Sequence, residues 1–217
     1  GQLTALARDA AMAARLDDVL LNAAIDHFAA WQQSWPGPCR QLWGTVCAET
    51  LADADAEFPA RLQHTLATAD LPATALVLDP LDNQPTDAAQ DSLRRLRATG
   101  IRTATSHTLA LTAAGPAPDA QASADFYDIA PALVDHCDSD PRARHLIAAT
   151  VEHAAAHQAT TSARQVATVG QHERLRRLGA GVARGPLYAT PMDADAMAGL
   201  IGEATAGIWQ SPVSGDA

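Results

Sequence analysis

The stretch TTSARQVATVGQHERLRRLGAGVARGPLYATPM, from Thr160 to Met192, decides the fold prediction. Its β-branched and polar start, residues 160–165, predicts a strand. Thr168 is followed three residues later by Gln171, a capping box that predicts the start of a helix, and Gly179 stands where a helix C-terminus favours glycine. A second apolar run then leads into a Gly-Pro turn. Strand, helix and strand at this spacing indicate an α/β repeat.

The order and spacing of these elements resemble the EAL-domain phosphodiesterases of bacterial cyclic di-GMP signalling, a family with a TIM-barrel-like fold. The family reads VVAEGVET, EEQLxxLxxLG and QGYLFxxPLP where this chain has TSARQVAT, GQHERLRRLG and RGPLYATPM. The resemblance extends from about Leu3 to Leu200. It implies an α/β fold, a TIM-like (β/α) barrel of the EAL type with about six mainly parallel strands and outer helices.

Six strands can be placed along the chain, at residues 41–47, 75–79, 101–106, 125–129, 160–165 and 181–184. The resemblance matches them to the third through eighth strands of the family's barrel. It therefore implies an incomplete barrel whose first two strands are missing. An open sheet has unsatisfied edges, so we expect another chain or the N-terminal helices to cover them. The EAL-like domain is expected over residues 1–210, with a disordered tail at 211–217.

Helices are predicted between these strands. Apolar residues at helical spacing, among them Met12, Leu16 and Leu20, predict helix from Leu3 to Trp35, as two helices rather than one. The remaining helices are expected at 54–69, at 86–98 before Gly100, from Pro131 for a short turn, from Pro141 to His157, and after the cap Asp193.

The family's reaction hydrolyses a phosphodiester with two divalent cations, which carboxylate oxygens must hold. The family's site positions fall on Thr45, Asp79, Asp82, Ser106, His107, Asp128, Ala130, Arg164 and Ala167, and the glutamine of its last motif falls on Arg184. Asp79 is the one carboxylate left among the metal-ligand positions, and Arg164 stands where the family has its first glutamate. Asp128 stands at the catalytic lysine, and the chain contains no lysine at all. The resemblance thus implies a protein without catalytic residues, bound metal or cofactor.

Asp128 and Arg164 carry the charges of a family lysine–glutamate pair with the signs exchanged. We therefore predict that their side chains form an ion pair.

Two functions remain open. The favoured one is a catalytically inactive EAL-like module that regulates or binds other proteins in cyclic di-GMP-related signalling, through a protein partner or self-association. The alternative is a metal-free receptor in which Arg164 and Arg184 bind the phosphates of cyclic di-GMP or of another anionic nucleotide. A separate and weaker possibility is a metal held by His153 and His157, which lie four residues apart on a predicted helix; a solvated helix face is the competing interpretation.

Composition limits the partners. A formal charge of −10 argues against nucleic acid and against contact with an anionic membrane surface. The three cysteines fit no zinc or redox spacing, which favours a reduced, cytoplasmic chain. No apolar run approaches the roughly 20 residues of a membrane-spanning helix.

Overall fold

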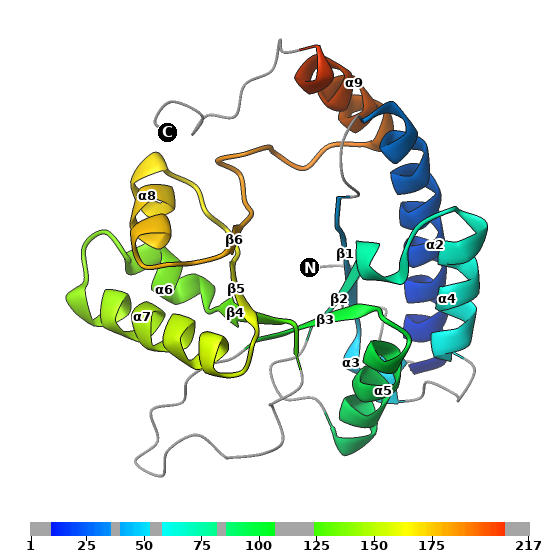
Figure 1. Cartoon of the computed structure of the whole chain (residues 1–217), viewed down its shortest axis with the longest axis horizontal. Coiled ribbons are helices and arrows are strands. Elements are labelled where there is room, and N and C mark those ends of the chain that lie inside the picture. The colour runs from blue at the N-terminus through cyan, green and yellow to red at the C-terminus, as the bar shows by residue number, and fades with distance from the viewer. Residues whose placement is uncertain (1–9, 36–39, 53–57, 82–85, 107–123, 207–217) are drawn as a thin grey trace. The chain divides into compact units, whose positions relative to one another are not determined.

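The computed structural model describes residues 10–35, 40–52, 58–81, 86–106 and 124–206. The chain divides into two compact units, unit 1 over residues 1–104 and unit 2 over residues 105–217 (Figure 1). Both units alternate outer helices with short parallel strands.

The described part of unit 1 alternates helices with three strands and includes one turn of 3-10 helix. The elements are α2 (Ala10–Ser34), β1 (Leu42–Val46), α3 (Ala48–Ala52), α4 (Phe58–Thr68), η1 (Ala73–Ala75), β2 (Leu76–Pro80), α5 (Asp87–Ala98) and, at the boundary with unit 2, β3 (Arg102–Ser106). β1 pairs with β2 and β2 with β3, both in parallel. Leu76 and Leu78 alternate with the residues of the opposite face and join the core against the helices.

The end signals of α5 lie where the sequence predicts them. The side chain of Thr86 accepts a hydrogen bond from the backbone N–H of Ala89, which caps the helix N-terminus. Gly100 follows the helix with a φ of +89°, a conformation that glycine adopts without steric cost. The prediction of a helix at 86–98 is confirmed.

Residues 10–34 form one uninterrupted helix, α2, and residues 3–9 of the predicted helical segment lie outside the described part. The buried side of α2 does not include all of the apolar residues that predict the helix. Ala13 and Leu21 are buried, whereas Met12 and Leu20, which help to define the predicted helix, are 52% and 57% exposed. Periodicity locates a helix, but it cannot select between two apolar faces of the same helix.

In the described part of unit 2, three further strands are each followed by a helix or a turn. Its elements are β4 (Phe126–Ile129), α6 (Pro131–His136), α7 (Pro141–Ala156), β5 (Thr160–Ala163), α8 (Val169–Arg177), β6 (Val182–Ala183) and α9 (Ala194–Thr205). β4 pairs with β5 and β5 with β6 in parallel. Ile129, Ala163 and Leu175 belong to the core that joins these strands to the helices.

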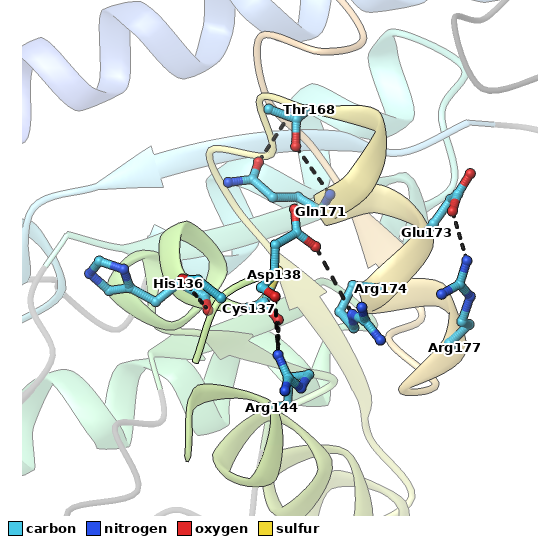
Figure 2. Close-up of polar contacts among 10 residues, drawn as sticks. His136, Cys137, Asp138, Arg144, Thr168, Gln171, Glu173, Arg174 and Arg177 are labelled. Carbon is cyan, nitrogen blue, oxygen red and sulfur yellow. Dashed lines mark hydrogen bonds and ion pairs between the residues drawn. The ribbon is translucent and has the colours of Figure 1, made fainter. Parts of the chain in front are cut away.

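The predicted capping box of α8 is present. The backbone N–H of Gln171 donates to the Thr168 hydroxyl at 3.1 Å, and the Gln171 side chain accepts from the Thr168 backbone N–H at 3.1 Å (Figure 2). Gly179 follows the helix with a φ of +87°. The capping residues therefore fix both ends of α8, as the sequence predicts.

Polar contacts tie the turn between α6 and α7 to α8. Arg144 donates to the backbone carbonyls of Cys137 and Asp138 at 3.2 and 3.1 Å, and the Asp138 carboxylate lies 4.0 Å from Nε of Arg174 (Figure 2). Cys137 is buried in the core there, and burial raises the pKa of its thiol, with the neighbouring Asp138 charge acting in the same direction.

All six predicted strand positions contain a strand within the described residues, with ends that differ from the predicted ones by at most two residues. Searched over the same residues, the helices include none with the length and hydrophobicity that crossing a bilayer requires.

Candidate functional site

Asp128, Arg164 and Arg184 meet on one face of the unit 2 sheet, and we call them the Asp128 cluster. Asp128 in β4 lies level with Ser162 in β5, and Ser162 lies level with Val182 in β6. Level residues of parallel strands point to the same face, as do residues two apart. Arg164 and Arg184, each two residues further along, therefore share the face of Asp128.

In the Asp128 cluster, two arginine side chains approach the same carboxylate oxygen. Nε of Arg164 lies 3.1 Å from Oδ2 of Asp128, and Nη2 of Arg184 lies 3.5 Å from the same oxygen. The Asp128 side chain is only 1% exposed, whereas those of Arg164 and Arg184 are 28% and 29% exposed. The predicted approach of Asp128 and Arg164 is confirmed. The sequence had not predicted that Arg184 would reach the same carboxylate.

Backbone hydrogen bonds hold Arg184 in place just beyond β6, against the segment that contains Arg164. The N–H of Arg184 donates to the carbonyl of Ala163 at 2.9 Å, and the N–H of Val166 donates to the carbonyl of Arg184 at 3.1 Å. The carboxyl ends of β5 and β6 are thus joined directly at the cluster. In parallel α/β sheets this end of the strands is the usual place for a site.

Gln165, between Arg164 and Val166, has a φ of +63°. The left-handed region disfavours residues with a Cβ, and the family pattern VVAEGVET has glycine at this position. The signal for an unusual backbone was thus present in the motif, although sequence reasoning did not use it.

Gly185 follows Arg184 with a φ of +154°, and a Cβ there would lie 2.4 Å from the backbone nitrogen of Val166. Only glycine allows the two chain segments to approach so closely at this point.

Two other predicted site positions lie in unit 1. Thr45 in β1 is level with Asp79 in β2, so the two share a face of the strand pair. Thr45 is exposed and Asp79 is 1% exposed. Ser106 is the last residue of β3. Asp82 and His107 lie outside the described residues.

Ala130 and Ala167 provide no side-chain donor or acceptor. Ala130 is half-buried and occupies the N-cap position of α6, where no side-chain capping bond forms. Ala167 is exposed, and its backbone N–H donates to the Gln171 side chain at 2.7 Å. Both residues lie at the N-terminal ends of helices, and neither methyl side chain adds a ligand to the Asp128 cluster.

The donor set of the Asp128 cluster does not fit a divalent cation. Mg²⁺ and Mn²⁺ bind oxygen ligands, and here one carboxylate faces two guanidinium groups that carry no lone pair for a metal. Among the described residues no group of three or more His, Cys, Asp or Glu side chains is arranged to hold a metal ion.

His153 and His157 belong to a cluster of rings with Tyr127. The imidazole centroids are 4.4 Å apart, and His153 stacks on Tyr127 at 5.6 Å. A hydrogen bond of 2.9 Å joins Nδ1 of His157 to the carbonyl of His153. Burial lowers the pKa of His153, and the nearby His157 lowers it further. The rings thus pack at the edge of the unit 2 core, and the possibility of a metal on this pair stays a prediction.

Comparisons with known proteins agree with the fold described above. The family model described as the EAL domain matches residues 1–191. No curated protein matches the chain. Among solved structures, the MucR phosphodiesterase in complex with c-di-GMP is 20% identical with a TM-score of 0.75, covering 91% of this chain and 85% of that one. The EAL domain of Mycobacterium smegmatis DcpA is also 20% identical, with a TM-score of 0.72 and coverage of 88% and 85%.

The cGMP-bound EAL enzyme Bd1971 is 17% identical with a TM-score of 0.76, and the match covers 91% of this chain. This chain spans 54% of the Bd1971 chain. At these identities the likeness establishes the fold. The predicted fold class, an α/β chain of the TIM-barrel-like EAL type with parallel strands and outer helices, is confirmed.

Proposed function

Because this chain belongs to the EAL-domain family, we propose that it is a catalytically inactive member that serves as a regulatory or protein-interaction module in cyclic di-GMP-related signalling. The observation that carries the proposal is the Asp128 cluster, in which a buried carboxylate is held by Arg164 and Arg184.

The charge of the cluster opposes metal-assisted hydrolysis. One carboxylate and two guanidinium groups give it a net charge of +1. At an effective dielectric constant near 20, a unit positive charge about 4 Å from a guanidinium group is repelled by about 4 kcal/mol. A divalent cation would meet this repulsion at the position where, by the family resemblance, a glutamate ligand would attract it.

The proton-transfer and charge-stabilising chemistry of the family lysine is also lost. Asp128 stands at that position, and the chain contains no lysine that another alignment could place there. The Asp128 carboxylate is an anion, is 1% exposed and is bound by two arginines, so it does not replace a cationic amine. The two changes together remove both the metal site and the cation from the family's reaction.

The test is hydrolysis of cyclic di-GMP. The protein is incubated with cyclic di-GMP and excess Mg²⁺ or Mn²⁺, beside the MucR phosphodiesterase domain as active reference, and the linear product pGpG is measured. We expect no product above the protein-free blank. Metal-dependent turnover that grows with protein concentration would overturn the proposal.

A second function is favoured by the exposure of the two arginines. Their side chains are 28% and 29% exposed, and planar guanidinium groups bind phosphate oxygens in pairs. The chain would then be a metal-free receptor for cyclic di-GMP or another anionic nucleotide. The structurally similar MucR domain is described in complex with c-di-GMP.

Calorimetric titration with cyclic di-GMP, with and without Mg²⁺, separates the two functions. A receptor binds without metal and loses affinity in Arg164→Met and Arg184→Met, whereas the exposed Arg94→Met of unit 1 binds like the original protein. Absence of binding in all proteins leaves the protein-interaction module as the function.

A further inference from the structure

The helix α2 presents two apolar faces, only one of which is covered. Ala13, Leu21, Ile25 and Phe28 are buried in unit 1. A second set of side chains, which we call the outer stripe, lies on another side of the helix and consists of Met12, Leu16, Val19, Leu20 and Ala23. At 100° per residue these five positions fall within about 100° of the helix circumference.

The outer stripe is exposed along the helix. Met12, Val19 and Leu20 are 52%, 66% and 57% exposed, Ala23 is exposed and Leu16 is half-buried. Single exposed apolar residues are normal on protein surfaces, but a continuous row of them marks an interaction surface. Ala30 lies on the same side of the helix, about one turn beyond His27. When Ala30 is included, the row of apolar side chains from Met12 onward is about 27 Å long at 1.5 Å per residue. Figure 1 shows α2 as the long helix at the start of the described chain.

We propose that the outer stripe binds the outer stripe of a second copy of this chain, with the two α2 helices antiparallel about a twofold axis. The proposal rests on the proposed function, because it identifies the surface through which an interaction module self-associates. The charges beside the stripe select this partner. Arg15 and Asp26 are both exposed, lie on the same edge of the stripe, and have no ion-pair partner among the described residues.

In an antiparallel pair each edge of the stripe faces the same edge of the other copy, with the chain direction reversed. Arg15 then lies opposite Asp26 of the partner subunit, and twofold symmetry forms this ion pair twice. In a parallel pair, Arg15 would instead lie at the same height as Arg15 of the partner subunit, and Asp26 at the same height as Asp26 of the partner subunit.

The same register also fits the side-chain sizes. It brings Leu16 near Ala23 of the partner subunit and Met12 near Ala30 of the partner subunit, so that large side chains lie over small ones. Val19 and Leu20 lie beside the twofold axis, where they contact their own copies. The most exposed side chains of the stripe thus form the centre of the interface, where truncation costs most affinity.

Sedimentation equilibrium on the purified chain tests the proposal over a wide concentration range. We expect a reversible monomer–dimer equilibrium. Val19→Glu should raise the dimer dissociation constant at least tenfold, because it buries two carboxylates beside the axis. The matched control is Gln33→Glu, which adds the same charge at an exposed position of α2 outside the stripe and should leave the constant within about twofold of the original. Circular dichroism confirms that both variants are folded.

Charge exchange tests the antiparallel register. Arg15→Asp alone and Asp26→Arg alone each place like charges together twice and should weaken the dimer several-fold, more at low salt than at high salt. The double variant restores opposite charges and should return the dissociation constant to near its original value. A failure of the double variant to recover would overturn the proposed register.

A strict monomer at all concentrations, or a dimer that Val19→Glu does not weaken, would overturn the proposal. These outcomes are distinct from failure of the proposed function, because turnover of cyclic di-GMP is measured independently of oligomeric state. A monomer without turnover rejects only the α2 interface. A dimer with turnover rejects only the catalytic inactivity.

Discussion

Arg164 at the end of β5 and Asp128 in β4 form an ion pair in which Nε lies 3.1 Å from Oδ2 and the carboxylate is 1% exposed. The strand register is its cause, since Asp128 is level with Ser162, two residues before Arg164. Arg184 approaches the same oxygen from β6 at 3.5 Å. Removing a charged partner from a carboxylate this deeply buried is strongly destabilising.

We predict that the two arginines stabilise the fold cooperatively. The double substitution Arg164→Met and Arg184→Met removes both of these cations from the buried Asp128 carboxylate and should lower the free energy of unfolding by about 3–5 kcal/mol. Each single substitution should cost less than half of that, because the other guanidinium still compensates the carboxylate. Urea unfolding of the four proteins measures the difference.

Two controls separate this effect from a general loss of charge. Arg94→Met removes a 60% exposed arginine and should cost under about 1 kcal/mol. Asp128→Asn, added to the double variant, removes the buried negative charge and should recover part of the stability. Strictly additive single substitutions, with no recovery by Asp128→Asn, would contradict the shared carboxylate.

Gln165→Gly should stabilise unit 2. The left-handed φ of +63° costs a residue with a Cβ roughly 1–2 kcal/mol, and glycine removes this cost while losing more conformational entropy on folding. We expect a net rise in the free energy of unfolding of roughly 0.5–1 kcal/mol by urea unfolding. Gln63→Gly, at an exposed position in the middle of α4, makes the same exchange in helical backbone and should destabilise by about 1 kcal/mol. A loss of stability in Gln165→Gly would show that its side chain contributes more than the backbone costs.

Gly185→Ala should destabilise the chain by roughly 2 kcal/mol or more, because the added Cβ would meet the Val166 backbone at 2.4 Å and the φ of +154° strains any side chain. Gly199→Ala in α9 is the matched control. A Cβ there meets nothing within 4 Å, and alanine favours the helix by roughly 0.5–1 kcal/mol. The midpoint temperature of thermal unfolding should therefore fall for Gly185→Ala and rise for Gly199→Ala. Equal shifts would contradict the close approach at Gly185.

The ring cluster predicts a pH dependence of stability. The pKa of His153 is lowered in the folded chain from its ordinary value of 6.5, first by burial and then by His157. The unfolded chain therefore binds the proton first, so this stabilisation is complete above about pH 6.5 and is lost as the pH falls toward the folded-state pKa. Urea unfolding at pH 7.5 and pH 5 should show this loss.

His153→Phe keeps a ring against Tyr127 but cannot titrate, so it should lose less stability between the two pH values than the original protein. His64→Asn, at an exposed position of α4, removes a histidine without a packed ring and should keep the original dependence. Equal losses in all three proteins would assign the pH dependence to other groups.

Local chemistry in the sequence was sufficient to predict most of the described elements, although α3 at Ala48–Ala52 was not predicted. Thr86, Thr168 and Asp193 cap helices because their side-chain oxygens accept from backbone N–H groups within the next three residues. Gly100 and Gly179 end helices because both need a left-handed backbone. These effects act over a few residues, so tertiary context does not change them.

The Asp128–Arg164 pair was predictable for a different reason. It follows from which strands are neighbours, and the family resemblance implies that order. That Arg184 shares the carboxylate depends on the register of β6 against β5, and no spacing along the chain specifies that register. The φ values of Gln165 and Gly185 follow from the joined ends of those strands, although the sequence marks both positions, the first by the glycine of the family pattern and the second by the Gly-Pro turn.

The sequence alone determined that the segment containing residues 10–34 is helical, because apolar residues recur at the helical period on more than one side, although it did not give the bounds of α2. Only the tertiary structure decided which side is buried. Leu21 and Ile25 pack into the unit 1 core, while Val19 and Leu20 stay exposed, because a helix lying against a strand layer can bury one stripe only. Periodicity is a property of the helix by itself, whereas burial depends on what packs against it.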